Sequence, residues 1–276
     1  MTTTVEVEEA LRRVGREDDS RIDLAEAALM LAAFGRPDAP VDPYRDHLGR
    51  LAVETAEAVS GANSLEDKVD AVNAVLFEHH GYQGDSKSYD DMQNADLMRV
   101  IDRRKGLPVA LGIVYIHVAR AQGWRCDGTN FPAHFLVRLE GDDAATMVDP
   151  FHGGQELDRD ALERRLESLI GESTELEPEY CAAVSNRAVL IRLQNNIKLR
   201  AMESGDVAHA AKILHTMTLI APNQAEPRCE LAALHIRNGE VKGAIRLLEE
   251  FTVETTDRSA CDSVLAYLTR LRSRLH

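Results

Sequence analysis

Residues 103–122, RRKGLPVALGIVYIHVARAQ, place three basic residues and a glycine directly before a long apolar segment. Pro108 suits the first turn of a helix, because the first N–H groups of a helix have no partner inside it and the φ of proline is already helical. The side chains that follow are apolar in nearly every direction, which is typical of a helix buried on most faces. Gly123 ends the pattern. We therefore predict a buried core helix over residues 108–122.

After this helix the apolar spacing changes to every second residue, which indicates strands. Residues 131–139 (FPAHFLVRL) and 146–149 (TMVD) predict two strands joined by a tight turn. His134 would lie in the middle of the first strand, and Asp149, 15 residues later, on the second. A cysteine at the start of a buried helix, a histidine on a following strand and an aspartate on the next form a papain-type triad. This chain has the histidine and the aspartate, but no cysteine at the helix start.

The segment before the core reads as a bundle of helices. Residues 1–20 are highly charged, so we expect a flexible, at most weakly helical N-terminus. Apolar stripes predict helices from about residue 22 to Gly35 and over residues 44–59. Ser64, with an acid three residues later, predicts a capping box that opens a third helix.

The segment after the core is helical and repeats itself. A helix is expected over residues 157–170 and an acidic linker over residues 171–185. Beyond the linker three pairs of residues are 34 apart, namely Gly205 and Gly239, Ala210 and Ala244, and Leu214 and Leu248. Thirty-four residues is the tetratricopeptide period, in which each unit is a helical hairpin that buries its face against its neighbours. We predict two partial units and a final capping helix over residues 259–274.

The composition limits the possible partners. The 276 residues include 32 Lys and Arg against 46 Asp and Glu, a formal net charge of −14. Such an acidic surface repels phosphate backbones, so nucleic acid is not an expected partner. We find neither a signal peptide nor an apolar run approaching the roughly 18 residues of a membrane helix. The four cysteines form no CxxC pair, which favours reduced cytoplasmic thiols over zinc or disulfides, and we expect no cofactor.

Five short segments carry a resemblance to a known family. They are NAVLF at 73–77, GYQG at 81–84, RRKGLPVAL at 103–111, PAHFLVR at 132–138 and VDPFHGG at 148–154. With them the chain resembles transglutaminase-like proteins, and more closely the SirB-type bacterial family, which couples such a domain to tetratricopeptide repeats. The resemblance implies that the nucleophile would stand at Pro108. SirB-type relatives look similar in lacking this cysteine, often with a hydroxyl residue where this chain has Ala110. Ala133 departs from the family's usual Pro-Gly-His motif.

The pair His134 and Asp149 has two interpretations, a cleft that binds a peptide and a hydrogen bond that only locks the hairpin. A metal site would gather both with His152, and with His79 or His80, because imidazole and carboxylate are suitable ligands. No two of these residues have a diagnostic spacing, and histidines at a helix end also complement the helix dipole. We therefore predict no metal.

Further candidates for the cleft are basic or aromatic. Arg103 and Arg104 stand beside the start of the core helix, where they suit an anionic group or an acidic peptide, or simply a helix end. Tyr82 and Tyr89 belong to a long polar loop, residues 81–94, and would rim the same cleft. Cys126 is the nearest thiol, but it lies near the start of the first strand, so we do not expect it to replace the nucleophile.

Together these observations predict an α+β protein. It would have a flexible segment (1–20), a transglutaminase-like domain with N-terminal helices and a small antiparallel sheet (21–170), a linker (171–185) and tetratricopeptide-like repeats (186–276). A core without its nucleophile favours a non-catalytic cytoplasmic adaptor or regulator that binds a protein or peptide. The alternative is a hydrolase or amidase in which His134 and Asp149 activate water, with or without a metal.

Overall fold

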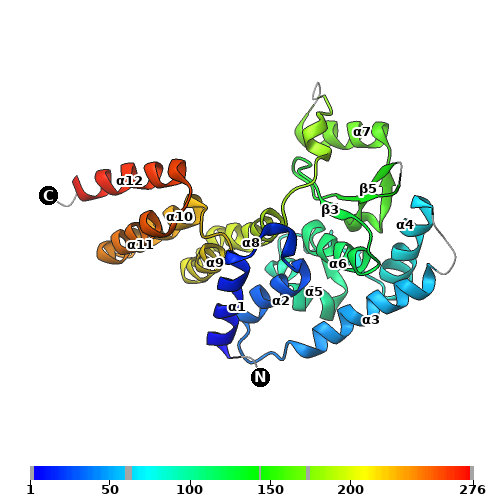
Figure 1. The fold of residues 1–276 in the computed structure, drawn as a ribbon, viewed down its shortest axis with the longest axis horizontal. Coiled ribbons are helices and arrows are strands. Elements are labelled where there is room, and N and C mark those ends of the chain that lie inside the picture. The colour runs from blue at the N-terminus through cyan, green and yellow to red at the C-terminus, as the bar shows by residue number, and fades with distance from the viewer. Residues whose placement is uncertain (1–2, 60–63, 143, 172–174, 274–276) are drawn as a thin grey trace.

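The computed structural model describes residues 3–59, 64–142, 144–171 and 175–273 of the chain. Within these residues helices dominate and two small sheets accompany them, so the predicted α+β class is confirmed. Figure 1 shows a body, made of the N-terminal helices and the core, and a helical tail that extends from it.

The N-terminal helices form one side of the body. They are α1 (Thr4–Arg16), α2 (Leu24–Gly35), α3 (Asp42–Ala58) and α4 (Leu65–Asn73). The prediction of a flexible segment is wrong for residues 4–16. Thr3 and Glu6 form a capping box there, and Val7 and Leu11, one turn apart, are buried. The high charge belongs to the outer face of an amphipathic helix whose inner face packs on α2 and on the tail.

Two local signals in the sequence are confirmed. Ser64 and Asp67 form the expected capping box at the start of α4, with Asp67 N donating to Ser64 Oγ at 3.0 Å. Helix α6 (Pro108–Ala121) begins at Pro108, and all of its residues up to Ile116 are buried. Helices α2, α3 and α5 (Leu97–Arg103) pack around it, so α6 is the centre of the body.

The polar loop between α4 and α5 contains short ordered pieces. A π-helical turn (Ala74–His79) continues α4, strand β1 (Gln83–Gly84) pairs in parallel with β2 (Lys105–Gly106), and a 3-10 turn, η3 (Met92–Ala95), leads into α5. The pairing of β1 with β2 places this loop beside the start of α6.

The four-stranded antiparallel sheet has the order β3-β4-β5-β6. Its strands are β3 (Cys126–Gly128), β4 (Val137–Glu140), β5 (Ala145–Asp149) and β6 (Gln155–Leu157). The expected hairpin is β4 with β5, in which Val137 lies opposite Val148. The prediction that His134 lies in mid-strand is wrong, because β4 begins only at Val137 and His134 occupies the bend before it. Ala133 has a φ of 53°, a left-handed conformation that breaks any strand.

The sheet leads to the tail through α7 (Arg159–Ile170) and a 3-10 turn, η5 (Pro178–Cys181). The tail consists of α8 (Asn186–Glu203), α9 (Val207–Ile220), α10 (Ala225–Arg237), α11 (Val241–Glu254) and α12 (Arg258–Ser273). The turns at Gly205 and Gly239 have matching geometry, with φ values of 78° and 81°. The residue after each glycine donates its N–H to the carbonyl five residues earlier, at 2.8 Å in both turns. The 34-residue spacing is therefore a repeat of the turn geometry.

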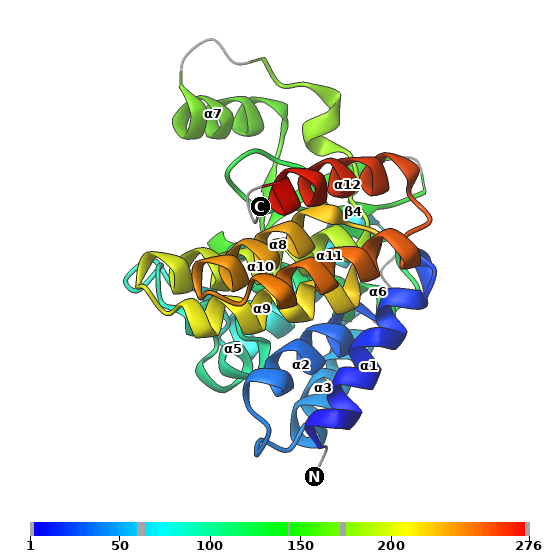
Figure 2. The ribbon, with the colours of Figure 1, turned by 90° about the vertical axis from the view of Figure 1, so that its left-hand side faces the viewer.

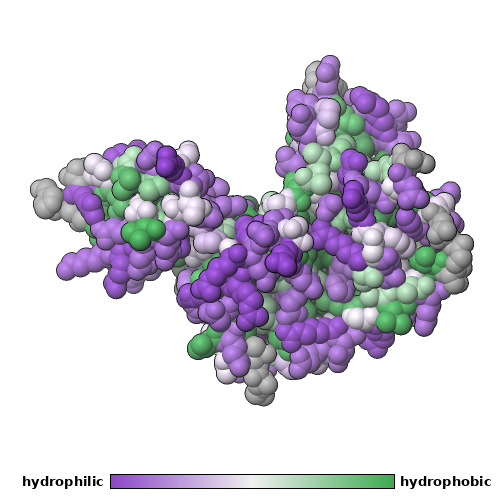
Figure 3. Space-filling model, in the orientation of Figure 1, coloured by the Kyte–Doolittle hydropathy of each residue, from purple (hydrophilic) through white to green (hydrophobic). Residues whose placement is uncertain are grey.

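The tail is not one unit in its packing. Helices α8 and α9 contribute Leu193 and Leu214 to the same hydrophobic core as α6, whereas α10 to α12 close a second core that contains Leu248 and Phe251. Figure 2 shows α8 to α11 stacked beside one another above α1 to α3. In Figure 3 the surface is largely hydrophilic and hollowed between the end of the tail and the region of α7. None of the helices in the described ranges has the length and apolarity that crossing a membrane requires.

Candidate functional site

Asp149, at the end of β5, is the centre of a buried polar cluster. It has no exposed surface, and its Oδ2 lies 3.0 Å from His134 Nε2, 2.8 Å from His152 Nδ1 and 3.2 Å from Arg165 Nη1. Its Oδ1 accepts the backbone N–H groups of Phe151 and His152. Burial alone would raise the pKa of Asp149, but hydrogen bonds and charges from His134 and His152 outweigh it and hold that pKa below its ordinary value.

The ring of His134 is fixed by the residue that follows it. The Phe135 ring fills a slot between α6 and β3, where a Cβ on Gly112 or on Gly128 would come within 2.4 Å of a ring carbon. Arg192, from α8, lies over this ring at 5.5 Å and donates to the backbone carbonyl of His134. Because glycines on α6 and β3 leave room for Phe135, these two elements hold the backbone beside His134.

A small cavity of about 70 Å³ separates His134 from the start of α6. Its walls are Tyr89, Leu107, Pro108, Val109, Ala133, His134, Phe135, Arg192 and Asn196. His134 uses Nε2 toward Asp149, as in a papain-type triad. The structure thus brings four of the candidate residues together at one site, namely His134, Asp149, Pro108 and Tyr89.

Two walls of this cavity were missed by the sequence analysis. Arg192 and Asn196 belong to α8, which we had assigned to the repeats because of its distance from the core in sequence. A contact between residues 58 positions apart, as between Arg192 and the carbonyl of His134, leaves no periodic signal in a single sequence. The cavity is therefore built by the core and the tail together.

The side chains around the cavity limit its chemistry. Proline and the apolar residues at the start of α6 carry no group that can attack an acyl carbon, and within the described structure no cysteine lines this space. Cys126 lies on β3, is 1% exposed, and burial raises the pKa of its thiol. A buried thiol with a raised pKa is unreactive.

Three of the proposed cleft residues lie away from this cavity and have partners of their own. Arg103 donates to Asp85 Oδ2 at 2.7 Å and to an asparagine in η3. Arg104 donates to the hydroxyl of Tyr82 at 3.1 Å and lies over its ring, and Tyr82 is buried against His47. These contacts tie the loop of residues 81–94 to the end of α5 and to α3. Of the other two, Tyr89 lines the cavity and His152 is half-exposed beside Asp149.

Two groups of side chains have the composition of a metal site. His134, Asp149 and His152 offer ligand atoms within 4.8 Å of one another, and Glu54, His79 and His80 form a separate set at the end of the π-helical turn. His79 and His80 thus contact Glu54 and not the Asp149 cluster. At Asp149 the guanidinium of Arg165 is 3.2 Å from the oxygen that a cation would need. This positive charge opposes binding of a divalent ion there.

Comparison with known proteins shows the family of this chain. The profile of the transglutaminase-like superfamily matches residues 42–195, which include α6, the sheet and the first part of α8. A UPF0162 protein of Xylella fastidiosa (strain Temecula1) is 32% identical over 239 residues, covering 85% of this chain and 84% of that protein. F-box only protein 21 of Mus musculus is 30% identical over 137 residues, which are 47% of this chain and 21% of that protein.

Among solved structures, a crystal structure of menin matches 91% of this chain and 70% of its own, with 12% identity and a TM-score of 0.41. The profile match spans more than half of the chain, and the match to the Xylella protein spans most of both proteins. The chain therefore belongs to the transglutaminase-like superfamily, among the UPF0162 proteins.

Proposed function

We propose that this protein is a non-catalytic member of the superfamily, of the SirB type, that acts in the cytoplasm as an adaptor or regulator by binding a peptide segment of another protein. One observation carries the proposal. Pro108, at the position that the resemblance gives to the nucleophile, lines the same cavity of about 70 Å³ as His134. The histidine and its aspartate are held in place around a position that cannot form an acyl-enzyme.

The tail supports a binding role. Its repeated hairpins have the period of tetratricopeptide units, whose stacked helices present extended concave surfaces to partners. Helix α8 joins this surface to the cavity, since it carries both Arg192 and Asn196. A peptide that places one small side chain in the cavity would contact the core and the tail at once.

The relatives support a modular role as well. The similar segment of F-box only protein 21 makes up only 21% of that protein, so most of its length is something else. A domain that occurs as a minor part of a longer chain is suited to supplying an interaction to its neighbours.

A hydrolase that activates water with His134 and Asp149 is the alternative. The two side chains are in hydrogen-bond contact at 3.0 Å, which is the arrangement that a general base needs. The Asp149 carboxylate is, however, shared with His152 and Arg165. Because Asp149 also binds these two residues, it orients His134 less exclusively than the aspartate of a catalytic triad orients its histidine.

Two measurements on the full chain separate these functions. The first is capture of partners from cytoplasmic extract by the wild type, by Asn196→Phe, which fills the cavity mouth, and by Asn238→Phe, an exposed control on the tail. We expect one set of partners to be lost only with Asn196→Phe. The second is turnover of peptide amides and esters by the wild type and by His134→Ala. Turnover that disappears in His134→Ala would establish the alternative and refute the non-catalytic function.

A further inference from the structure

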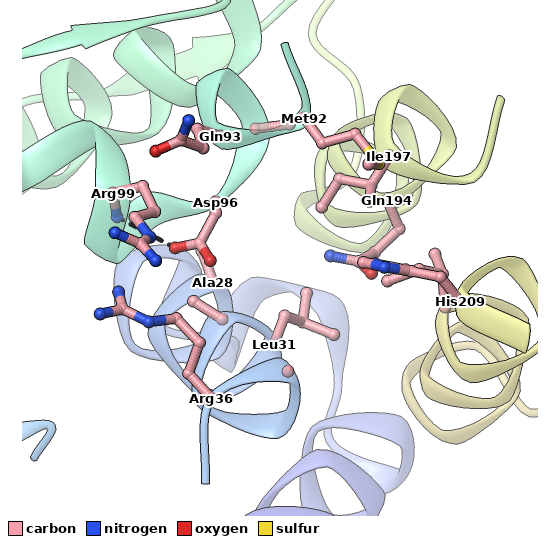
Figure 4. A pocket seen from close by; sticks show the side chains of 14 residues that line it. Ala28, Leu31, Arg36, Met92, Gln93, Asp96, Arg99, Gln194, Ile197 and His209 are labelled. Atoms are coloured by element: carbon pink, nitrogen blue, oxygen red, sulfur yellow. Dashed lines mark hydrogen bonds between the residues drawn. The ribbon is translucent and has the colours of Figure 1, made fainter. Parts of the chain in front are cut away.

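A second cavity, of about 210 Å³, lies where α2, the η3–α5 segment, α8 and α9 meet. Figure 4 shows it from close by, with Asp96 and the arginines Arg36 and Arg99 on one wall and Gln194 and His209 on the opposite wall. Its volume is below the roughly 300–1,000 Å³ of sites for drug-sized ligands. A ligand of this cavity must therefore be small.

Gln194 is the first reason to assign it a ligand. The side chain is 2% exposed, and its Oε1 lies 3.3 Å from Thr216 Oγ1. This contact turns the amide nitrogen Nε2 toward the cavity, as Figure 4 shows, and there it donates to no residue that the structure describes. Nε2 is therefore a donor that is open to the cavity. A ligand that accepts a hydrogen bond at this point would give Nε2 a partner.

Asp96 supplies the complementary group on the facing wall. One of its oxygens accepts Arg99 N at 3.0 Å and so caps α5, and Figure 4 shows its carboxyl turned toward the cavity. Burial raises the pKa of this carboxyl, although Arg36 and Arg99 act against the rise. A cationic donor beside the carboxylate would offset its burial.

The rest of the lining defines the remainder of the ligand. In a chain with a net charge of −14, this cavity has two arginines and a histidine against one aspartate, so it attracts a negative group. Ala28, Leu31 and Ile213 contribute apolar side chains to the lining. The ligand that fits these walls therefore has a cationic and an anionic group at one end and is otherwise apolar.

We propose that this cavity binds a free α-amino acid with an apolar side chain. Its ammonium group donates to Asp96, its carboxylate accepts from Gln194 Nε2 on the opposite wall, and its side chain packs on the apolar lining. The cavity is distinct from the one beside His134, although α8 contributes to both. The proposal therefore stands whether or not the other cavity binds a peptide.

Isothermal titration of the full chain with L-leucine tests this, alongside 4-methylpentanoate, which lacks the amino group, and isoamylamine, which lacks the carboxylate. We expect L-leucine to bind and each analogue to bind at least tenfold more weakly, because each loses one charged hydrogen bond. Equal binding of one analogue would overturn the zwitterionic assignment. Absence of binding by L-alanine, L-valine, L-leucine, L-isoleucine, L-methionine and L-phenylalanine up to about 10 mM would overturn the site itself.

Two variants locate the binding. Gln194→Met removes the amide while Thr216 Oγ1 keeps its bond to the Ile213 carbonyl at 2.8 Å, and Asp96→Asn keeps an oxygen to cap α5. Each should weaken L-leucine binding about tenfold or more. Asp158→Asn is the matched control, because Asp158 caps α7 in the same way and is not part of this cavity. If both cavity variants bind L-leucine like the control, the ligand sits elsewhere and the proposal is refuted.

Discussion

Replacing Pro108 by cysteine would put a thiol back at the position that faces His134. The N-terminal position of Pro108 tolerates the change, because the N–H that cysteine adds belongs to the first turn, where a helix has no internal partner for it. The start of a helix and a nearby histidine both favour the thiolate. We therefore expect Pro108→Cys to fold and to contain an acidic thiol.

The helix start and His134 together set the expected increase in the reactivity of the thiol. An ordinary thiol with a pKa of about 8.5 is roughly 3% ionised at pH 7, whereas a thiol with a pKa of about 7 is roughly half ionised. The introduced thiol should therefore react with iodoacetamide about tenfold faster at pH 7 than an unperturbed cysteine does. The pH profile of the alkylation rate gives the pKa directly, with the introduced thiol distinguished from the four native cysteines by peptide mapping.

Two further variants separate the effect of the helix terminus on the thiol pKa from the effect of His134. Pro43→Cys places a thiol at the exposed start of α3, which provides a helix terminus without the His134 environment, and should show a smaller decrease of the pKa. In the double variant Pro108→Cys with His134→Ala, the thiol pKa should rise most of the way back to that of an unperturbed cysteine. If the thiol pKa in Pro108→Cys is 8.5 or higher, or if His134→Ala leaves it unchanged, the position across from His134 is not that of a nucleophile.

Three further predictions concern the stability of the fold. Asp149→Ala leaves His134, His152 and Arg165 without their shared carboxylate, and should lower the free energy of unfolding in urea by about 3 kcal/mol; a loss below 1 kcal/mol would show that the cluster is not cohesive. Gly112→Ala drives a methyl group into Phe135 and should cost about 1–3 kcal/mol, whereas alanine at Gly49, where a Cβ meets nothing within 4 Å, should be neutral or stabilising. Burial and the charge of Arg104 lower the pKa of His47 to about 4, below the 6.5 of an exposed histidine; the unfolded chain therefore binds the proton first, and stability should fall as the pH drops from 6.5 toward 4, a decrease that His47→Gln should reduce.

The sequence predicted those features that depend on neighbouring residues. Ser64 with Asp67 and the helix start at Pro108 are local signals, and both occur where expected. The strands β3 and β6 have only three residues each, too few for a period to stand out. His134 was placed in a strand because the alternation of residues 131–139 does not reveal the left-handed φ of Ala133.

The site was predictable in part for the same reason. His134 and Asp149 meet because the hairpin of β4 and β5 joins them, so their contact follows from the local order of the chain. The partners of Arg103, Arg104 and Tyr82 come near only when the loop folds. The residue types alone therefore did not predict where these side chains point. The walls from α8 depend on packing between segments far apart in sequence, which a single sequence does not record.

Helix α8 gives the tail mechanical access to both cavities. Its 18 residues form a rod of about 27 Å. Along this rod Arg192 touches the carbonyl of His134, Gln194 faces the second cavity, and Arg200 contacts Asp90 in the polar loop. A change in the position of this one helix would therefore alter both cavities and the polar loop together.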